Sequence, residues 1–192
     1  MEKIGRTQLL AQYARGRRDF SAVDISEEDL FEADLQGINL NGSYLEKSYL
    51  PYSNLSQAQL RQAQLQAAEL SDTKLYQINL SQANLQQANL SRATLRHANL
   101  RGANLAYANL QGADLGNADL SDANLNYANL SGANLTKANL SHAKLKGTNF
   151  FRSQNVDFAN AYVEGSTIYP DGHRFDCHDD CQVSSLSRES EI

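Results

Sequence analysis

Leucine occupies every fifth position from Leu30 to Leu145, an unbroken register of 24 leucines. A small residue, most often alanine, stands two positions before each leucine, and Asn or Asp most often stands immediately before it. The run Ala83-Asn84-Leu85 shows this five-residue unit. Internal repetition at a fixed period is the signature of a repeat architecture, so this register decides the fold class.

A period of five fits neither regular secondary structure. On an α-helix, five residues advance the side-chain direction by about 140°, so the leucines would be spread around all sides. On a flat strand, an odd step would place successive leucines on opposite faces. All leucines reach one interior only if the backbone turns a corner in every repeat. The sequence therefore predicts a coil, or solenoid, with leucine and alanine inside.

The A(N/D)Lxx unit, which runs from about residue 18 to residue 152, resembles the pentapeptide repeat family and is similar in density to its cyanobacterial members. The resemblance implies an all-β fold, a right-handed quadrilateral parallel β-helix with four repeats in each coil. At ~4.8 Å per coil, about seven coils would form a rod roughly 32 Å long. The leucine and the preceding alanine would both point inward, which gives a structural core that includes Leu85, Leu90, Leu95, Leu100, Ala83, Ala88 and Phe150.

Four repeats per coil predict that residues twenty apart stack on one another. The predicted outward columns include Asn84, Asn104 and Asn124, whose amides would hydrogen-bond within the stack and to corner backbone groups rather than bind a ligand. Four stacked pairs are also expected: Tyr107 with Tyr127, Gly112 with Gly132, Asp72 with Arg92, and Asp122 with His142.

A solenoid must cover its terminal coils, because an open coil presents unpaired strand edges and exposed leucines. Residues 1–17 are predicted to form a short N-terminal capping α-helix over about Thr7–Arg15. Thr7 would be the N-cap, Leu9 and Tyr13 would lie on the apolar face, and Gly16 would end the helix.

The β-helix is predicted to span residues 18–170, with a register slip at 151–157 and a bulged corner near 151–155. After the slip, the expected inward residues are Phe158, Val163 and Ile168, with Val156, Ala161 and Ser166 in the small position. Tyr169–Gly172 has the composition of a tight turn. The C-terminal segment, 171–192, is expected to be largely disordered after residue 182.

Weak candidates for a metal site lie in this last segment: His173, Cys177, His178 and Cys181. Their side-chain types suit zinc, but the spacing matches no standard zinc finger. A Cys-x3-Cys pair could also form a reversible disulfide. In a reducing cytoplasm free thiols are the default, so the prediction is no metal and no cofactor.

Other features weigh against an enzyme. His97 and His142 occupy outward positions without a nucleophile beside them, and the chain has neither a phosphate-binding glycine loop nor an HExxH motif. The longest apolar run is too short to span a bilayer, and the first residues lack an apolar signal core, so a cytoplasmic protein is expected. Tyr44, Tyr49 and Tyr52 are either a protein contact patch or cross-coil stacking.

The sequence thus predicts a non-enzymatic interaction or structural scaffold whose flat faces bind a protein partner of unknown identity, with no direct binding of nucleic acid and no membrane. The family resemblance implies an alternative, a DNA mimic that binds DNA gyrase or topoisomerase IV. Against it, acids gather near the N-terminal end, from Asp19 to Asp34, while Arg92, Arg96 and Arg101 occupy the middle. The protein is expected to be a monomer or an end-to-end homodimer.

Overall fold

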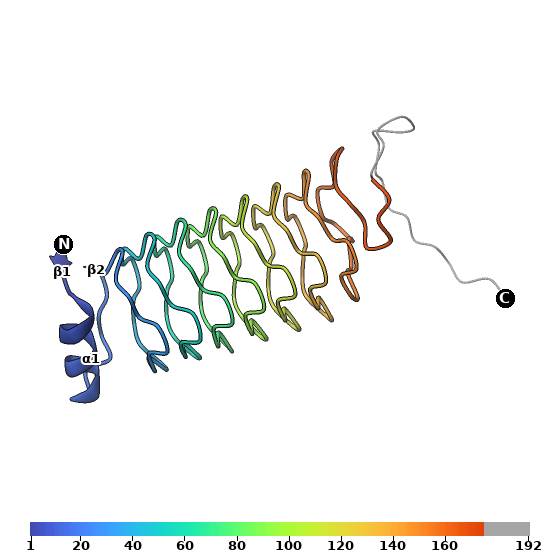
Figure 1. Ribbon diagram of the computed structural model, residues 1–192. Helices are drawn as coiled ribbons and strands as arrows, with labels where there is room; N and C mark the ends of the chain where they lie inside the picture. Colours follow the sequence, from blue (N-terminus) through green and yellow to red (C-terminus); the bar gives the residue numbers. More distant parts are fainter. Residues whose placement is uncertain (175–192) are drawn as a thin grey trace.

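The computed structural model of the protein describes residues 1–174. Figure 1 shows a rod of stacked coils with a short helix at the N-terminal end. The named elements are β1 (Glu2–Lys3), α1 (Arg6–Ala14) and β2 (Val23–Asp24), and β1 pairs in parallel with β2. Beyond β2, the coils are joined by single-residue bridges, which are parallel throughout the stack.

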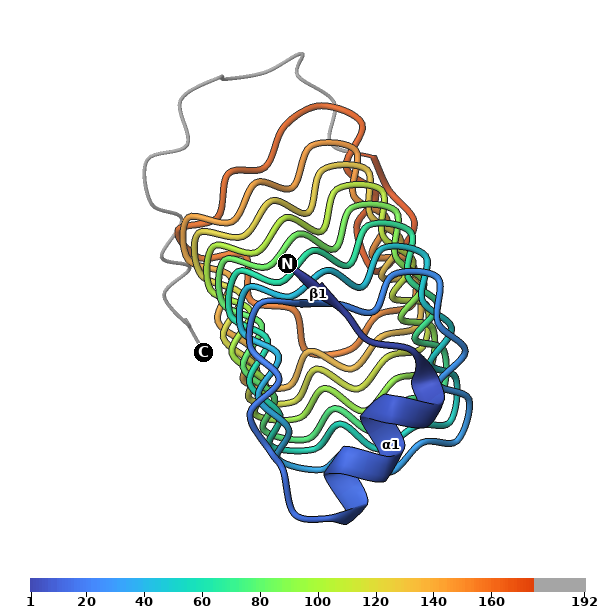
Figure 2. The ribbon, with the colours of Figure 1, turned by 90° about the vertical axis from the view of Figure 1, so that its left-hand side faces the viewer.

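Bridges recur every five residues along the chain and link residues twenty apart in neighbouring coils. Each coil of twenty residues therefore has four sides. Figure 2 shows the four-sided outline of the stacked coils. We name the faces by their bridging residues: face A runs from Asp19 to Asn139, face B from Asp24 to Tyr162, face C from Asp29 to Ile168, and face D from Asp34 to Gln154.

Each corner between faces is a two-residue turn. The leucine C=O accepts a hydrogen bond from the N–H of the small residue three positions later, as between Leu80 and Ala83 at 3.0 Å. The second turn residue has a positive φ, 59° at Gln82 and 66° at Gly147. This resembles a type II turn, a geometry that disfavours residues with a Cβ. Each corner aligns the next face for inter-coil bonds, such as Leu80 N–H to Asn99 C=O at 2.7 Å.

The inward positions form one continuous apolar core along the rod. Burying a leucine side chain stabilises the fold by roughly 1.5–3 kcal/mol, so the repeated column is the main source of stability. The residues expected there are all at most 1% exposed: Leu85, Leu90, Leu95, Leu100, Ala83, Ala88 and Phe150. Thr73 occupies a small inward position, and its hydroxyl donates to the C=O of Leu50 at 2.9 Å, so a polar group there is satisfied internally.

The helix α1 lies across the N-terminal end of the coils, as Figure 2 shows. Leu9 is fully buried in the core, and Gly16 has the positive φ that suits a chain leaving a helix. The prediction that Thr7 is the N-cap is wrong, because the cap residue is Gly5 and makes no side-chain capping bond. Instead the Glu28 carboxylate accepts from the backbone N–H of Arg6 at 2.8 Å. A carboxylate from the first coils thereby stabilises the positive end of the helix.

The repeat is first broken within a coil in the orange part of the chain in Figure 1. The break begins later than the predicted bulge at 151–155, because Gln154 still bridges Asn134 twenty residues earlier. The unit then resumes at once as Val156-Asp157-Phe158, without the two turn residues that every earlier corner contains. As a result the chain cuts the corner between faces D and A.

The cut corner shortens the register on the next face. Tyr162 bridges Lys144, which lies eighteen rather than twenty residues earlier. A second irregularity follows, since Ile168 bridges Asn149 nineteen residues earlier. The extra residue is Glu164, whose C=O accepts from Thr167 N–H in the position that a leucine C=O normally holds.

This second irregularity corrects two of the predicted inward positions. Thr167, not Ser166, is the fully buried small residue, and Ile168 is a bridging residue rather than the central inward one. Tyr169 takes the central position, where its ring packs 5.0 Å from that of Phe158. The stack then ends on face C, where the chain turns back and Ile168 pairs antiparallel with Arg174. An antiparallel turn thus covers this part of the last strand edge.

Gly112 and Gly147 both have a φ of 66°. Replacing each by alanine therefore imposes the same backbone strain, and any difference in stability between the two variants reports steric crowding of the added Cβ. A Cβ on Gly147 would lie 2.5 Å from the Tyr127 ring, whereas a Cβ on Gly112 would lie 3.7 Å from Arg92. Gly147→Ala should therefore lower the free energy of unfolding by about 1–3 kcal/mol more than Gly112→Ala, as measured by urea unfolding. Equal losses for the two variants, or no relief when Tyr127→Ala is added to Gly147→Ala, would contradict this reading.

Candidate interaction surface

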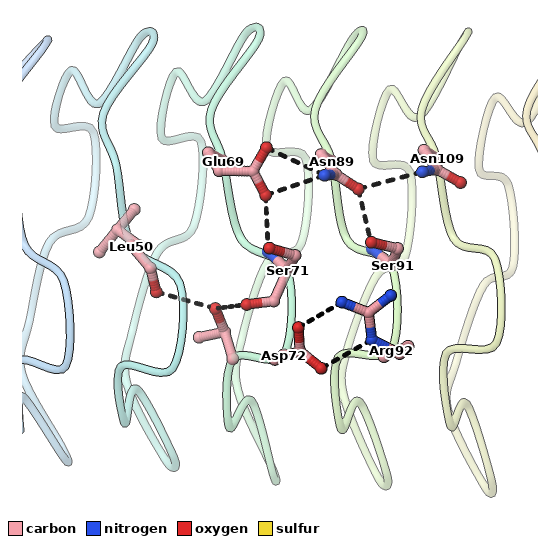
Figure 3. Close-up of polar contacts among 9 residues, drawn as sticks. Leu50, Glu69, Ser71, Asp72, Asn89, Ser91, Arg92 and Asn109 are labelled. Carbon is pink, nitrogen blue, oxygen red and sulfur yellow. Dashed lines mark hydrogen bonds and ion pairs between the residues drawn. The ribbon is translucent and has the colours of Figure 1, made fainter.

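The Asn columns are hydrogen-bonded ladders, as predicted. Asn104 donates from its amide to Asn84 Oδ1 at 3.2 Å, and Asn124 donates to Asn104 Oδ1 at 3.1 Å. Figure 3 shows a similar ladder on face C, in which Asn89 Oδ1 also accepts from the backbone N–H of Ser91 at 3.1 Å. One side-chain oxygen thus serves both the stack and the following corner, which explains why Asn or Asp is repeated at this position.

The predicted pair of Asp72 and Arg92 is confirmed and is drawn in Figure 3. Arg92 Nε lies 2.8 Å from Asp72 Oδ1, and a terminal guanidinium nitrogen lies 2.6 Å from Oδ2. The hydrogen bonds from Arg92, followed by its positive charge, lower the pKa of Asp72 below its ordinary value. This pairing neutralises both charges on the corner between faces C and D.

The predicted stacking of Tyr107 on Tyr127 is confirmed, with ring centroids 5.1 Å apart. The predicted pair of Asp122 and His142 is wrong. Asp122 pairs with Arg101 at 3.3 Å instead of with His142. The His142 ring lies instead 5.9 Å from that of Tyr162 in the next coil. An arginine side chain is long enough to reach the neighbouring column, so the twenty-residue rule does not decide its partner.

The exposed feature that stands apart from these ladders is an aromatic cluster at the corner between faces C and D. The Phe31 ring stacks on Tyr49 with centroids 6.1 Å apart and meets Tyr52 edge-on at 5.8 Å. Phe31 is 36% exposed, Tyr49 46% and Tyr52 56%. Three aromatic rings therefore present an apolar surface to solvent on a rigid corner.

Carboxylates border this aromatic cluster. Tyr49 is bridged to Asp29 in the coil before it and to Glu69 in the coil after it. Arg6 of α1 forms an ion pair with Asp29 at 3.3 Å, which links the helix to the base of the cluster. The surroundings of the rings thus carry more acidic than basic groups.

The sequence pattern predicts Tyr49 and Tyr52 as neighbours but does not include Phe31. The signal was present, because Phe31 lies twenty positions before Pro51 and so falls next to Tyr52 in the stack. Tyr44 is also exposed, but it lies on face B, and within residues 1–174 its ring contacts neither Tyr49 nor Tyr52. The exposed aromatic cluster therefore contains Phe31 in place of Tyr44.

Of the four weak candidates for a metal site, only His173 lies within the described residues. His173 is exposed and lies 3.0 Å from Asp171 through Nδ1, while Cys177, His178 and Cys181 lie outside the described residues. Up to residue 174, no three His, Cys, Asp or Glu side chains are grouped as a metal site would require. Nor does that part of the chain contain a helix long and apolar enough to span a membrane.

The described chain resembles known repeat proteins in sequence and in structure. The family model "Pentapeptide repeats" matches in eight copies over residues 29–66, 52–82, 63–102, 83–122 and 113–150. No curated protein matches the chain.

Similar solved structures include HetL, a pentapeptide repeat protein involved in heterocyst differentiation regulation in the cyanobacterium Nostoc sp. strain PCC 7120. It is 27% identical, with 90% of this chain and 100% of HetL covered and a TM-score of 0.48. Rfr23 from the cyanobacterium Cyanothece 51142 is 26% identical, with 85% and 99% covered and a TM-score of 0.41. QnrB1, a plasmid-mediated fluoroquinolone resistance protein, is 17% identical, with 85% and 87% covered and a TM-score of 0.42.

The Asp72–Arg92 pair predicts a pH-dependent contribution to stability. Because the pKa of Asp72 is lowered in the folded protein, the contribution is present above the unfolded value of about 3.9 and is lost as pH falls through the folded value. Asp72→Asn should therefore lower the urea midpoint slightly at pH 7, as for an exposed ion pair. The difference from wild type should vanish in acid below the folded pKa, and an unchanged difference there would contradict the assignment.

Proposed function

Because this chain belongs to the pentapeptide repeat family, whose members fold as right-handed quadrilateral β-helices, we propose that it is a non-enzymatic scaffold that binds a partner protein. The observation that carries the proposal is the exposed cluster of Phe31, Tyr49 and Tyr52. Proteins of this family generally serve as structural or interaction proteins, and this cluster is a specific place for such an interaction.

The aromatic cluster has the composition and rigidity of a binding hot spot. Aromatic side chains are enriched at protein interfaces, where a few of them supply most of the binding free energy. Here Tyr49 and its neighbours stand on a corner held by inter-coil hydrogen bonds, including Tyr49 N–H to Glu28 C=O at 2.9 Å. A surface that is already ordered loses little conformational entropy when a partner binds.

The charges around the cluster indicate a partner with a basic residue at the contact. Asp29 and Glu69 lie on either side of Tyr49 in the stack, and Glu32 lies next to Tyr52 in the coil before it. Among residues 1–174, the Glu32 carboxylate has no hydrogen bond or ion pair, although its backbone N–H is paired with Pro51 C=O at 3.1 Å. A lysine or arginine placed over the rings would gain both cation–π and carboxylate contacts.

We expect the double variant Tyr49→Ala with Tyr52→Ala to lose a partner that the wild-type protein captures from a lysate of its native host. Truncating two aromatic anchors should weaken binding about tenfold or more. The matched control is Tyr107→Ala with Tyr127→Ala, which removes an equally exposed stacked pair on another corner. Capture is measured by quantitative mass spectrometry, with circular dichroism to verify folding.

Two outcomes would remove the proposal. One is that wild type, cluster variant and control variant capture the same proteins in the same amounts. The other is that the control variant loses the partner and the cluster variant retains it, since that would place the contact on the corner of Tyr107.

A DNA mimic that binds gyrase or topoisomerase IV remains the second candidate, favoured by the acidic residues between Asp19 and Asp34. Mimicry of a duplex requires negative charge along the rod, because DNA carries one charge per ~1.7 Å of its axis. In the middle of this rod three of the acids are paired with arginines. The pairs are Asp72 with Arg92, Asp114 with Arg96, and Asp122 with Arg101.

This charge distribution predicts that the purified protein, added at micromolar concentration, leaves DNA supercoiling by gyrase unchanged. Gyrase activity and its inhibition by a fluoroquinolone would be measured with and without the protein on an agarose gel. Protection of gyrase from the drug, or inhibition of supercoiling in proportion to added protein, would instead favour the DNA mimic.

A further inference from the structure

Each coil contributes one short strand segment, or rung, to each face. Face A has one rung fewer than faces B and C at the C-terminal end, because the chain cuts the corner after Gln154. Asn139 is bridged to Asp119 in the coil before it, but it has no bridge to a later coil. Faces B and C both continue past this level, to Tyr162 and Ile168. The strand edge at residues 137–141 is therefore open on the side of the C-terminal end.

The preceding coil shows what this edge lacks. There Asn117 N–H donates to Thr136 C=O at 2.9 Å, and Leu120 N–H donates to Asn139 C=O at 2.8 Å. The C=O of Ala118 accepts from the N–H of Asn139 at 2.9 Å. Three backbone groups per coil thus join each rung of face A to the next.

One coil later the equivalent groups are unpaired. The N–H groups of Lys137 and Leu140 and the C=O of Ala138 have no hydrogen-bond partner among the described residues. Ala138 is 7% exposed and Leu140 2%, so these groups stand at the edge of the core, where unsatisfied backbone is costly. The edge presents a donor, an acceptor and a donor in sequence.

A hollow of about 300 Å³ lies beside this edge. Its walls come from the open edge and from the segment that cuts the corner: Lys137, Ala138, Asn139, Leu140, Ser141, Asp157, Ala159 and Asn160. The space that a missing rung would fill is thus open to solvent.

We propose that the edge at Lys137–Ser141 binds an extended segment of another protein, which adds the missing rung in parallel to Asn139. The alternation of backbone donor and acceptor groups matches an extended polypeptide, whose main chain supplies both partners at strand spacing. Ala138 and Leu140 are already buried, and Val156 and Phe158 pack against the core beside them, so the added segment would be held by main-chain hydrogen bonds. This strand-addition site is separate from the aromatic cluster and does not depend on it.

The probe is a synthetic ten-residue peptide with the sequence of residues 115–124, which forms the rung one coil earlier. It is added to the ¹⁵N-labelled full-length chain. We expect the amide signals of Lys137 and Leu140 to shift and their exchange with solvent to slow by about tenfold or more, as for a newly formed hydrogen bond. The amides of Asn117 and Leu120, which are already paired, serve as internal controls and should not change.

Two matched changes test the geometry. A peptide that is N-methylated at the residue copying Asp119 cannot donate to the C=O of Ala138 and should not bind. A protein variant with Ser-Gly inserted between Asn155 and Val156 regains the two missing turn residues. In this variant the Leu140 amide should be protected from exchange without peptide, and adding the peptide should no longer shift its signal. The same insertion between Asp171 and Gly172 should leave the peptide-induced shift intact.

Several results would overturn the proposal. They are no shift at millimolar peptide, equal binding of the N-methylated peptide, or shifts centred on the N-terminal coils. Protection of the Lys137 and Leu140 amides before any peptide is added would also overturn it. The edge would then be covered by residues 175–192 or by a second copy, which dilution and a chain ending at residue 174 would distinguish.

Discussion

The two-residue corner is the constraint on which the rest of the structure depends. A coil closes in twenty residues only if each of its four corners takes two residues, the second of them at positive φ. Glutamine, arginine and histidine adopt this conformation at Gln57, Arg92 and His97, with φ between 57° and 62°. Such strain persists only where the surroundings over-determine the backbone. Here the surroundings are the inter-coil hydrogen bonds and the leucine column, which together hold the corners before Gln154 in one geometry.

The inward pattern could be predicted because it depends on local spacing, and the two ends could not because they depend on contacts distant in sequence. Burial of leucine and alanine follows from any coil with a corner in each pentad. The start of α1 does not, since the carboxylate of Glu28, rather than the nearby Thr7, accepts from its first N–H group, that of Arg6. Near the other end, one additional residue, Glu164, moved Ile168 from the interior to a bridging position. A single insertion is invisible in a sequence where leucine no longer marks the register.

The candidate surface was predictable only in part, for a related reason. Stacking at twenty residues identifies neighbours in the same column, and it correctly paired Asp72 with Arg92 and Tyr107 with Tyr127. Long side chains also reach sideways, so Arg101 took the carboxylate that the column rule assigned to another residue. Phe31 joins the tyrosine cluster in the same way, across adjacent columns at one corner. Outward positions therefore need the geometry of the corner as well as the period.

The features that stabilise this rod differ from those that are left to bind a partner. Where the corners are complete, backbone groups are paired, the Asn ladders satisfy one another, and little is left to recognise a partner. Recognition requires a departure from that state, either apolar surface left exposed or backbone groups left unpaired. The aromatic cluster around Tyr49 is the first kind of departure, and the cut corner beside Leu140 is the second. Both cost the isolated protein free energy that binding can recover.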